Sequence, residues 1–361
     1  MKYIFYITNH GFGHASRNVP IIKKLLERDS AGIIYIKSDV VRCEFLNRNF
    51  KNDSRIKYFA DCSEVGLVLQ EGTLEPDIVK MKVAIQRDLN NWNKYIKKEM
   101  AFLKKETPDI IISDIVGWPI IAAKRYNIKT VLIGNFSWAQ MYKSFYDASI
   151  WEPYLECYKK ADKAIWYEIH DKELEQYCKN YECVSMVSRE IDEHAVWQIK
   201  KEYGSRPIVF VSLGASAEIN KRVNVENLPY NFLVTRGLKL IGDNVVELPP
   251  DMINTPDYIS AADYVIAKGG WSTIAEIMLQ RKKCALFFRG KNSEDENTIK
   301  TLTERKQCIC LFGNELENIN KIISNIDKLA PKTYDMYIDD TDKICDIIYL
   351  SLIHISEPTR R

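Results

Sequence analysis

Short apolar runs alternate with helix-length amphipathic segments along the chain, a pattern typical of β-α-β units and a mainly parallel sheet. In the first part of the chain, the predicted strands are Tyr3–Thr8, Ile33–Ile36, Asp109–Ser113 and Thr130–Ile133. The predicted helices of this part are Ser16–Glu27, Asp77–Lys105 and Ile120–Tyr126. The order of these elements predicts an α/β fold.

The alternation restarts after a polar, aromatic and charged stretch from about Tyr154 to Tyr203. The predicted strands of this second part are Pro207–Leu213, Phe232–Thr235, Tyr264–Ala267 and Ala285–Phe288. We therefore expect two doubly wound Rossmann-like domains facing each other across a cleft, at residues 1–188 and 189–330, followed by a helix at 331–349. Ligands of such sheets bind beyond the carboxyl ends of the strands, so the turns after the strands are the expected site.

Composition narrows the possible classes of partner. The 361 residues include 51 Lys and Arg against 49 Asp and Glu, and the net charge of +2 argues against a nucleic-acid partner. Nine cysteines without a CxxC pair argue against a disulfide framework or a zinc ribbon. Because no apolar run reaches the roughly 18 residues of a membrane-spanning helix, we expect a cytoplasmic protein without a transmembrane segment. Peripheral contact with a membrane stays open.

The end of the sequence differs in character from the rest. Residues 350–360 read LSLIHISEPTR, which resembles the in-frame translation of a sequencing adapter. We therefore expect residues 350–361 to be an artefact without function, and the natural C-terminus, with any downstream domain, to be lost near residue 349.

The first glycine turn, NHGFGHASR at Asn9–Arg17, lies between a predicted strand and a predicted helix. Gly11 and Gly13 let the backbone approach a ligand, and the following helix N-terminus favours an anion. With Ser16 in the third position, the turn nearly matches the dinucleotide fingerprint G-x-G-x-x-G, and Asp39 lies where an acid for the ribose is expected. A tight turn without any ligand is the alternative.

His14 lies inside this turn, which the dinucleotide interpretation does not predict. A histidine at the cleft is suited to take a proton from a hydroxyl group near neutral pH. Asp114 ends a predicted strand at the same edge of the sheet, so it is the candidate partner that orients the imidazole. A structural hydrogen bond for His14 and a capping role for Asp114 are the alternatives.

A second constellation follows the predicted strand Tyr264–Ala267, where the sequence reads AKGGWSTIAE. Gly269 and Gly270 predict a turn, with Ser272 and Thr273 at the start of a helix. The amides and hydroxyls at such a helix N-terminus can hold a diphosphate, and Glu276 can accept hydrogen bonds from ribose hydroxyls. Without a ligand, the same residues would form a capping box.

Taken together, the two halves resemble the GT-B glycosyltransferases over roughly residues 1–325. The layout is similar to the bacterial lipid-intermediate N-acetylglucosaminyl transferase and to natural-product glucosyltransferases. It is most similar to the glycosyltransferase-like N-terminal domain of L-arabinokinases. The stretches that carry this likeness are HGFGHAS, Asp61–Ser63, Ile112–Asp114 and Asn135–Trp138.

The resemblance implies that the C-terminal domain binds a nucleotide-sugar donor and the N-terminal domain binds the acceptor. It assigns Gly214, Ser216, Gly270, Ser272 and Thr273 to the diphosphate, and Glu276 to the ribose. One or more of the acids Glu294, Asp295 and Glu296, in a predicted loop, would face hydroxyl groups of the donor sugar. A solvated surface loop is the alternative for these acids.

The resemblance also implies an inverting mechanism without a metal or cofactor. His14, oriented by Asp114, would deprotonate a hydroxyl acceptor of unknown identity, with Gly11, Gly13 and Arg17 in the acceptor-side loop. UDP-sugar is the expected donor by family frequency alone. The run Asp340–Asp342 is expected to begin the last helix rather than to bind metal.

Other interpretations remain open at this stage. They are a GT-B-like sugar- or nucleotide-binding domain without activity, a nucleotide-sugar epimerase and an NAD-dependent reductase. The aromatic residues that could stack on an acceptor, but that we expect to serve mainly in packing, are Trp138, Tyr142, Phe145, Tyr146 and Trp151.

Overall fold

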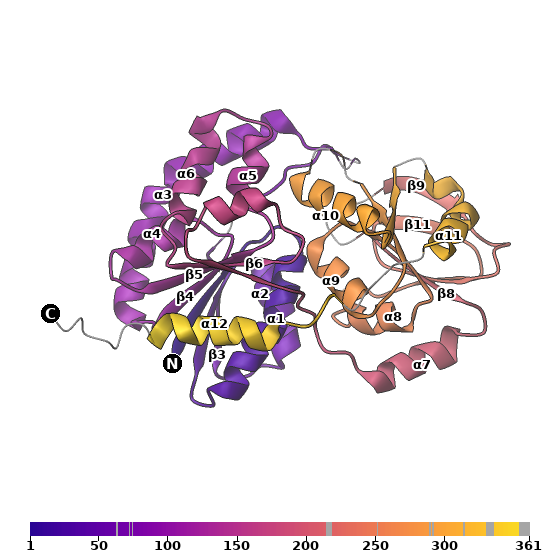
Figure 1. Cartoon of the computed structure of the whole chain (residues 1–361), viewed down its shortest axis with the longest axis horizontal. Helices are drawn as coiled ribbons and strands as arrows, with labels where there is room; N and C mark the ends of the chain where they lie inside the picture. The colour runs from indigo at the N-terminus through magenta and orange to yellow at the C-terminus, as the bar shows by residue number, and fades with distance from the viewer. Residues whose placement is uncertain are drawn as a thin grey trace.

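The computed structural model describes residues 1–361 except 63, 72, 74, 214–218, 251, 289, 291, 313–314, 330–335 and 354–361. The chain forms two lobes, each built around a parallel sheet with helices packed against it (Figure 1). The predicted fold class, two doubly wound α/β domains, is confirmed.

The N-terminal lobe contains a seven-stranded sheet in the order β3-β2-β1-β4-β5-β6-β7. Its strands are β1 Lys2–Ile7, β2 Ile33–Lys37, β3 Ile56–Phe59, β4 Ile110–Asp114, β5 Lys129–Gly134, β6 Lys163–Tyr167 and β7 Tyr181–Val184. Its helices are α1 Gly13–Arg28, α2 Val40–Phe50, α3 Ile78–Glu106, α4 Trp118–Lys124, α5 Trp138–Lys143, α6 Ala148–Tyr158 and the short 3₁₀ helix η1 Lys172–Gln176.

The C-terminal lobe contains a six-stranded sheet in the order β12-β10-β8-β13-β14-β15 and a two-stranded sheet of β11 and β9. Its strands are β8 Ile208–Ser212, β9 Ile219–Asn224, β10 Asn231–Val234, β11 Leu238–Ile241, β12 Val245–Glu247, β13 Tyr264–Lys268, β14 Cys284–Phe287 and β15 Cys308–Leu311. Its helices are α7 Glu193–Tyr203, α8 Thr255–Ala261, α9 Trp271–Leu279, α10 Ser293–Glu304, η2 Glu315–Glu317 and α11 Ile319–Asp327.

In both large sheets the strand order reverses once, between β1 and β4 and between β8 and β13. The turns that leave β1 and β13 lead into α1 and α9, and these two helices contact each other across the lobes. Such reversal points are where doubly wound sheets bind ligands, beyond the carboxyl ends of their strands. The fold therefore places both glycine turns at one interlobe cleft.

The chain returns to the N-terminal lobe through α12, Thr341–Ile353, which packs against α1 (Figure 1). Arg28 of α1 bonds to Asp342 and Asp346, at 2.6 Å each. Asp340, just before α12, accepts a hydrogen bond from the Ser185 amide at 2.6 Å. The run Asp340–Asp342 thus lies at the start of this helix, and its carboxylates bind protein groups. Residues 354–361 lie outside the described part.

The aromatic residues after β5 belong largely to the core of the N-terminal lobe. Trp138 and Tyr142 are fully buried and stacked, with ring centroids 5.4 Å apart. Phe145, Tyr146 and Trp151 are partly buried and pack against the same cluster. Within the described residues, no helix combines the length and the apolar character needed to cross a membrane.

Candidate active site

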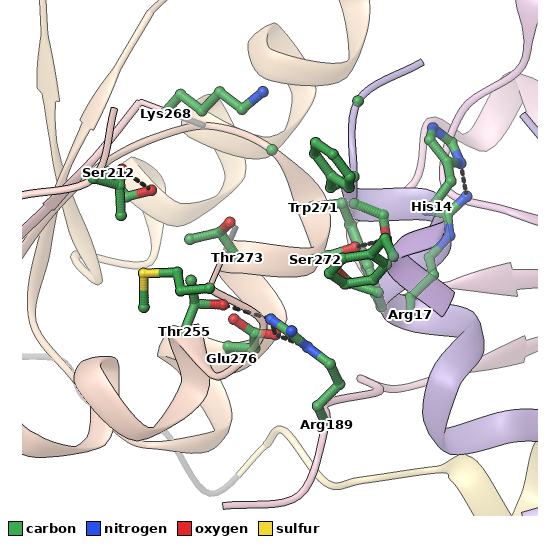
Figure 2. A pocket seen from close by; sticks show the side chains of 18 of the residues that line it. His14, Arg17, Arg189, Ser212, Thr255, Lys268, Trp271, Ser272, Thr273 and Glu276 are labelled. Carbon is green, nitrogen blue, oxygen red and sulfur yellow. Dashed lines mark hydrogen bonds and ion pairs between the residues drawn. The ribbon is translucent and has the colours of Figure 1, made fainter. Parts of the chain in front are cut away.

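A cavity of about 380 Å³ lies between the lobes (Figure 2). On the N-terminal side it is lined by the turn between β1 and α1, including Gly11, Gly13 and His14. On the C-terminal side it is lined by the start of α9, where Gly270 caps the helix. Both glycine turns that the sequence singles out therefore face one space.

His14 lies in the first turn of α1 and is 5% exposed. Its Nδ1 lies 2.8 Å from Oδ1 of Asp114, the last residue of β4, which is 1% exposed. A carboxylate oxygen only accepts hydrogen bonds, whereas Nη2 of Arg17 only donates and lies 2.8 Å from the same Nδ1, so these two contacts favour opposite tautomers. With the hydrogen on Nδ1, directed at Asp114, the lone pair lies on Nε2. In this tautomer the imidazole can accept a proton at Nε2.

Asp114 also binds the guanidinium of Arg17, a residue that the sequence analysis placed in an acceptor-side loop. Arg17 belongs to α1, one turn after His14, and is 2% exposed. Its Nε donates to Oδ2 of Asp114 at 2.8 Å, and its Nη2 bonds to Oδ1 of the same carboxylate. Asn18 donates to Oδ2 at 2.6 Å, and Asn135 accepts from Arg17 at 2.6 Å. Arg17 is thus part of a buried polar network.

This network sets the charges of its members. Burial alone would raise the pKa of Asp114, but Arg17 and His14 hold that pKa at about 2. The pKa of His14 is lowered by burial and by the charge of Arg17, against the opposing effect of Asp114. Asp114 is therefore an anion and His14 a neutral imidazole near neutral pH.

The N-terminus of α9 binds directly to the glycine turn of the other lobe. The Ser272 hydroxyl donates to the carbonyl oxygen of Gly13 at 2.7 Å. A Cβ atom on residue 13 would lie 3.2 Å from this hydroxyl, so the close approach of the lobes favours glycine there. Helix α9 has no side-chain cap, because Gly270 is its N-cap. The capping-box alternative for Ser272, Thr273 and Glu276 is therefore not realised.

Glu276 instead pairs with Arg189, a residue of the segment that connects the lobes. Nη2 and Nε of Arg189 lie 2.8 and 3.1 Å from Oε1 of Glu276 (Figure 2). Arg189 also binds the Thr255 hydroxyl at 2.5 Å and the carbonyl oxygen of Ile253. The two charged side chains are 9% and 4% exposed, so this is a nearly buried ion pair.

The sequence analysis predicted a loop for the three acids at 294–296, and this is wrong. They lie in the first turn of α10, whose N-cap is Asn292. Negative side chains are favoured there because the helix N-terminus is partly positive. Glu294 lines the cavity, and its Oε1 lies 3.1 Å from Nδ2 of Asn135. Asp295 is fully buried and Glu296 is exposed. Glu294 is therefore the acid that faces the cavity.

The other predicted positions have mixed outcomes. Gly214 and Ser216 lie outside the described residues. Gly269 packs against Asp295 and Ile299 of α10, where an added Cβ would lie 3.3 Å from both side chains. Asp39 caps α2 by accepting from the Arg42 amide and pairs with the Arg42 guanidinium at 3.0 Å. The ribose role that the dinucleotide interpretation gives to Asp39 thus has no support in these contacts.

Several cavity residues were missed by the sequence analysis. Lys268 directly precedes the glycine pair, and a cation at that position was a recognisable signal for an anionic ligand. His10 begins the HGFGHAS turn and Ser212 ends β8, so both lie where ligands of such sheets are expected. No local pattern marks the polar lining residues Arg48, Arg189, Arg236 and Thr255.

Comparisons with known proteins agree with this architecture. Residues 242–343 match the family described as the glycosyltransferase family 28 C-terminal domain. L-arabinokinase of Arabidopsis thaliana is 24% identical over 331 residues, which cover 85% of this chain and 30% of the plant protein. The chain therefore spans less than a third of that relative.

Solved glycosyltransferase structures share the fold over nearly the whole chain. CalG4, the calicheamicin glycosyltransferase, matches with a TM-score of 0.65 at 12% identity, covering 99% of both chains. UGT2 of Phytolacca americana, complexed with UDP-2fluoro-glucose and pterostilbene, matches with a TM-score of 0.64 at 11% identity. That match covers 98% of this chain and 99% of UGT2.

The fold, the cleft and these matches describe one architecture: the chain has the two-lobed fold of the solved glycosyltransferase structures. Within its C-terminal lobe and the following segment, residues 242–343 are similar to the glycosyltransferase family 28 C-terminal domain. This domain includes α9 and α10, the two helices that bring Glu276 and Glu294 to the cavity.

Proposed function

We propose that the chain is an inverting, metal-independent glycosyltransferase that moves a sugar from a nucleoside diphosphate sugar to a hydroxyl acceptor. One observation carries the proposal. His14, which is bonded to the buried Asp114, lines the same cavity as the N-terminus of α9. A base for the acceptor and a positive helix end for a departing diphosphate are the two groups that direct displacement requires.

In the proposed reaction, Nε2 of His14 takes the proton of the acceptor hydroxyl while its oxygen attacks the anomeric carbon. The bond from that carbon to the diphosphate oxygen breaks, and the diphosphate leaves toward α9. Asp114, kept ionised by Arg17, stabilises the imidazolium that forms. A single displacement inverts the configuration at the anomeric carbon, and the helix N-terminus supplies the charge stabilisation that a metal provides in other enzymes.

On the donor side, we assign the diphosphate to the backbone amides around Gly270, Ser272 and Thr273. Oε1 of Glu276 binds Arg189, so Oε2 is the oxygen that we assign to the ribose hydroxyls. Glu294 faces the donor sugar. UDP is the first nucleotide to test, because UGT2 of Phytolacca americana has the same fold and was solved with UDP-2fluoro-glucose.

The test begins with thermal-shift and calorimetric titrations of UDP, GDP, dTDP and their sugars, with NAD as a negative control. Glu276→Gln keeps an acceptor oxygen for Arg189 but replaces its other carboxylate oxygen, so nucleotide affinity should fall about 10-fold or more. Glu296→Gln changes an exposed acid that lies outside the cavity lining and should leave the affinity unchanged.

His14→Ala should bind the nucleotide within about 3-fold of the wild type but lose transfer by at least about 100-fold, because it removes only the base. An equal loss of nucleotide affinity in the His14 and Glu276 variants would contradict this division of roles. A hit with NAD alone would contradict the donor assignment altogether.

A second candidate is a sugar- or nucleotide-binding domain without transferase activity. It is favoured by the likeness to Arabidopsis L-arabinokinase, of which the chain covers only 30%. Tight nucleotide binding with no turnover of any bound sugar nucleotide, across a panel of hydroxyl acceptors, would support this candidate over the transferase.

A further inference from the structure

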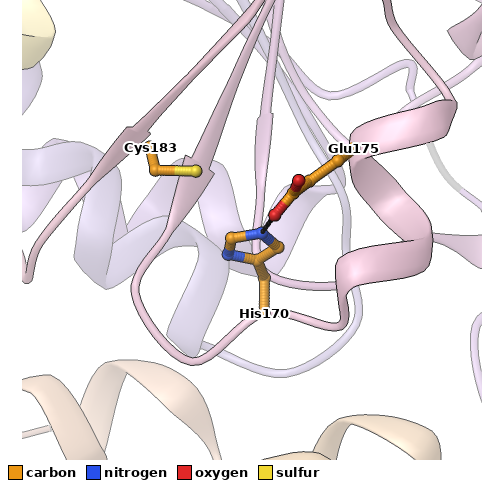
Figure 3. A group of neighbouring side chains, drawn as sticks. All are labelled: His170, Glu175 and Cys183. Atoms are coloured by element: carbon orange, nitrogen blue, oxygen red, sulfur yellow. Dashed lines mark hydrogen bonds and ion pairs between the residues drawn. The ribbon is translucent and has the colours of Figure 1, made fainter.

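Three potential metal ligands of different chemistry gather on the N-terminal lobe, apart from the interlobe cavity. They are His170, Glu175 and Cys183, whose ligand atoms all lie within 4.8 Å of one another (Figure 3). His170 follows β6, Glu175 belongs to η1, and Cys183 lies on β7, the edge strand of the sheet. Three consecutive segments thus converge on one point.

The hydrogen bonds of His170 fix its tautomer. Its Nδ1 lies 2.8 Å from the carbonyl oxygen of Tyr167, and a carbonyl oxygen only accepts, so Nδ1 carries a hydrogen. In the neutral imidazole, Nε2 then holds a lone pair. Nε2 lies 3.2 Å from Oε1 of Glu175, which also only accepts. Nε2 and Oε1 thus lie side by side, and the Cys183 sulfur lies within 4.8 Å of both.

The surrounding contacts resemble the second shell of a metal site. Histidines that bind metals usually donate their other ring N–H to a carbonyl or carboxylate, as His170 does to Tyr167. The Tyr181 hydroxyl donates to Oε2 of Glu175 at 2.7 Å, which orients Oε1 toward His170. Tyr181 and Cys183 are two residues apart on β7, so their side chains share one face of the strand.

The donor set indicates the class of metal. One imidazole nitrogen, one carboxylate oxygen and one thiolate sulfur suit Zn²⁺, with a fourth position open to water. Tetrahedral Zn²⁺ holds such ligand atoms about 3.5 Å apart. The His170–Glu175 distance is already close to this value, and the sulfur of the exposed Cys183 lies within 4.8 Å of both ligand atoms, so metal binding requires only a small movement of that side chain.

We propose that His170, Glu175 and Cys183 bind a zinc-type divalent cation at the edge of the N-terminal sheet. The site has a structural consequence for the interlobe contact. The segment before His170 accepts hydrogen bonds from the other lobe: Trp271 donates to the Glu168 carbonyl at 2.8 Å, and Asn297 to the Ile169 carbonyl at 3.0 Å. A cation on His170 would therefore fix the segment on which α9 and α10 rest. The proposal is independent of the transferase assignment.

The test uses the full chain, stripped of metal with a chelator and then titrated with Zn²⁺ and Co²⁺. We expect one equivalent of Zn²⁺ to bind, and Co²⁺ to give the charge-transfer absorption of a thiolate ligand. Cys183→Ser should abolish that absorption, and His170→Ala should weaken Zn²⁺ binding by about 100-fold or more. Tyr181→Phe, which removes only the orienting hydroxyl, should weaken binding by about 10-fold.

Two control variants separate this site from adventitious binding. Cys310 is a partly exposed cysteine of the other lobe, and His194 lies on α7, so Cys310→Ser and His194→Ala should leave the titration unchanged. Binding that persists in the His170 and Cys183 variants would overturn the proposal. The absence of stoichiometric binding to the wild type would also overturn it.

Discussion

Glu64 offers a direct test of how burial acts on the stability of the N-terminal lobe. This carboxyl group is 6% exposed and accepts a hydrogen bond from Nε1 of Trp138 at 2.8 Å. The Thr8 side chain and the Gly117 backbone also act to lower its pKa, but within the described part of the chain the other oxygen, Oε1, is buried and makes no hydrogen bond of normal geometry. Burial, only partly offset by hydrogen bonds, raises the pKa of Glu64 to about 8. The substitution to test is Glu64→Gln, which keeps an acceptor for Trp138 and removes the titration.

The magnitude follows from linkage between the pKa and folding. A pKa of about 8 in the folded protein against 4.5 for an ordinary glutamate corresponds to roughly 5 kcal/mol, as an upper limit. Because the pKa is raised in the folded protein, the contribution of Glu64 to the free energy of unfolding is fully present below about pH 4.5. This contribution is lost as the pH rises to about 8. The wild type should therefore lose up to this amount across that window, and Glu64→Gln should not.

The assay is urea unfolding followed by the fluorescence of the seven tryptophans, at about pH 5 and about pH 8.5. Other groups titrate in this range, so the informative quantity is the difference in unfolding free energy between variant and wild type at each pH. This difference should favour the variant by several kcal/mol more at the higher pH. Glu296→Gln, at an exposed position, is the matched control and should show no such dependence.

A difference that is the same at both pH values would refute the reasoning. It would mean that Glu64 is ionised in the folded protein near neutral pH and that solvent or a neighbouring group supports its charge. A variant that is less stable than the wild type at both pH values, with the same pH dependence, would have the same meaning.

Two further predictions concern the cleft. Arg17→Gln should raise the pKa of His14, because it removes the cation that opposes protonation of the imidazole. The same substitution should lower the free energy of unfolding by about 3 to 5 kcal/mol, because it leaves Asp114 buried without its main partner. NMR titration of the five histidines measures this pKa. Arg28→Gln, about three turns beyond Arg17 on α1, should leave it unchanged. Ser272→Ala should lower the free energy of unfolding in urea by about 1 kcal/mol, because it removes the hydrogen bond to Gly13. An unchanged free energy of unfolding would show that this contact is not formed in solution.

Much of the fold could be predicted from the sequence because its central strands are continuous apolar runs. The predicted strands that begin at Tyr3, Pro207 and Tyr264 match β1, β8 and β13 within two residues at each end. The strands β6 and β7 were missed. They are only five and four residues long and lie among aromatic and charged residues, so no clear hydrophobic period separates them from their surroundings.

The acids at 294–296 show a different kind of failure. The signals of a helix start were present, since an asparagine precedes three acids and a partly apolar helical stretch follows. The resemblance to glycosyltransferases suggested a loop instead, and that interpretation was wrong. Local capping chemistry was the better guide at this position.

The site was predictable where it depends on turns after strands. Asp114 ends β4, and His14 and Glu276 lie on the helices that follow β1 and β13, positions that the rule for doubly wound sheets brings together. Arg189 was not predictable, because it lies 87 residues from Glu276 in sequence and no motif surrounds it. Its role comes entirely from the tertiary path of the connecting segment.

The path of the chain between the lobes has a mechanical consequence. The polypeptide crosses once before α7 and again before α12, and the two crossings pair as a parallel bridge between Met186 and Asp339. The Met186 amide donates to the Ile338 carbonyl at 3.0 Å, and the Asp340 amide donates to the Met186 carbonyl at 2.9 Å. In covalent terms, the C-terminal lobe is an insertion into the N-terminal one. Because the two crossings are paired, they act as a hinge. They permit one lobe to swing toward the other more readily than to slide past it.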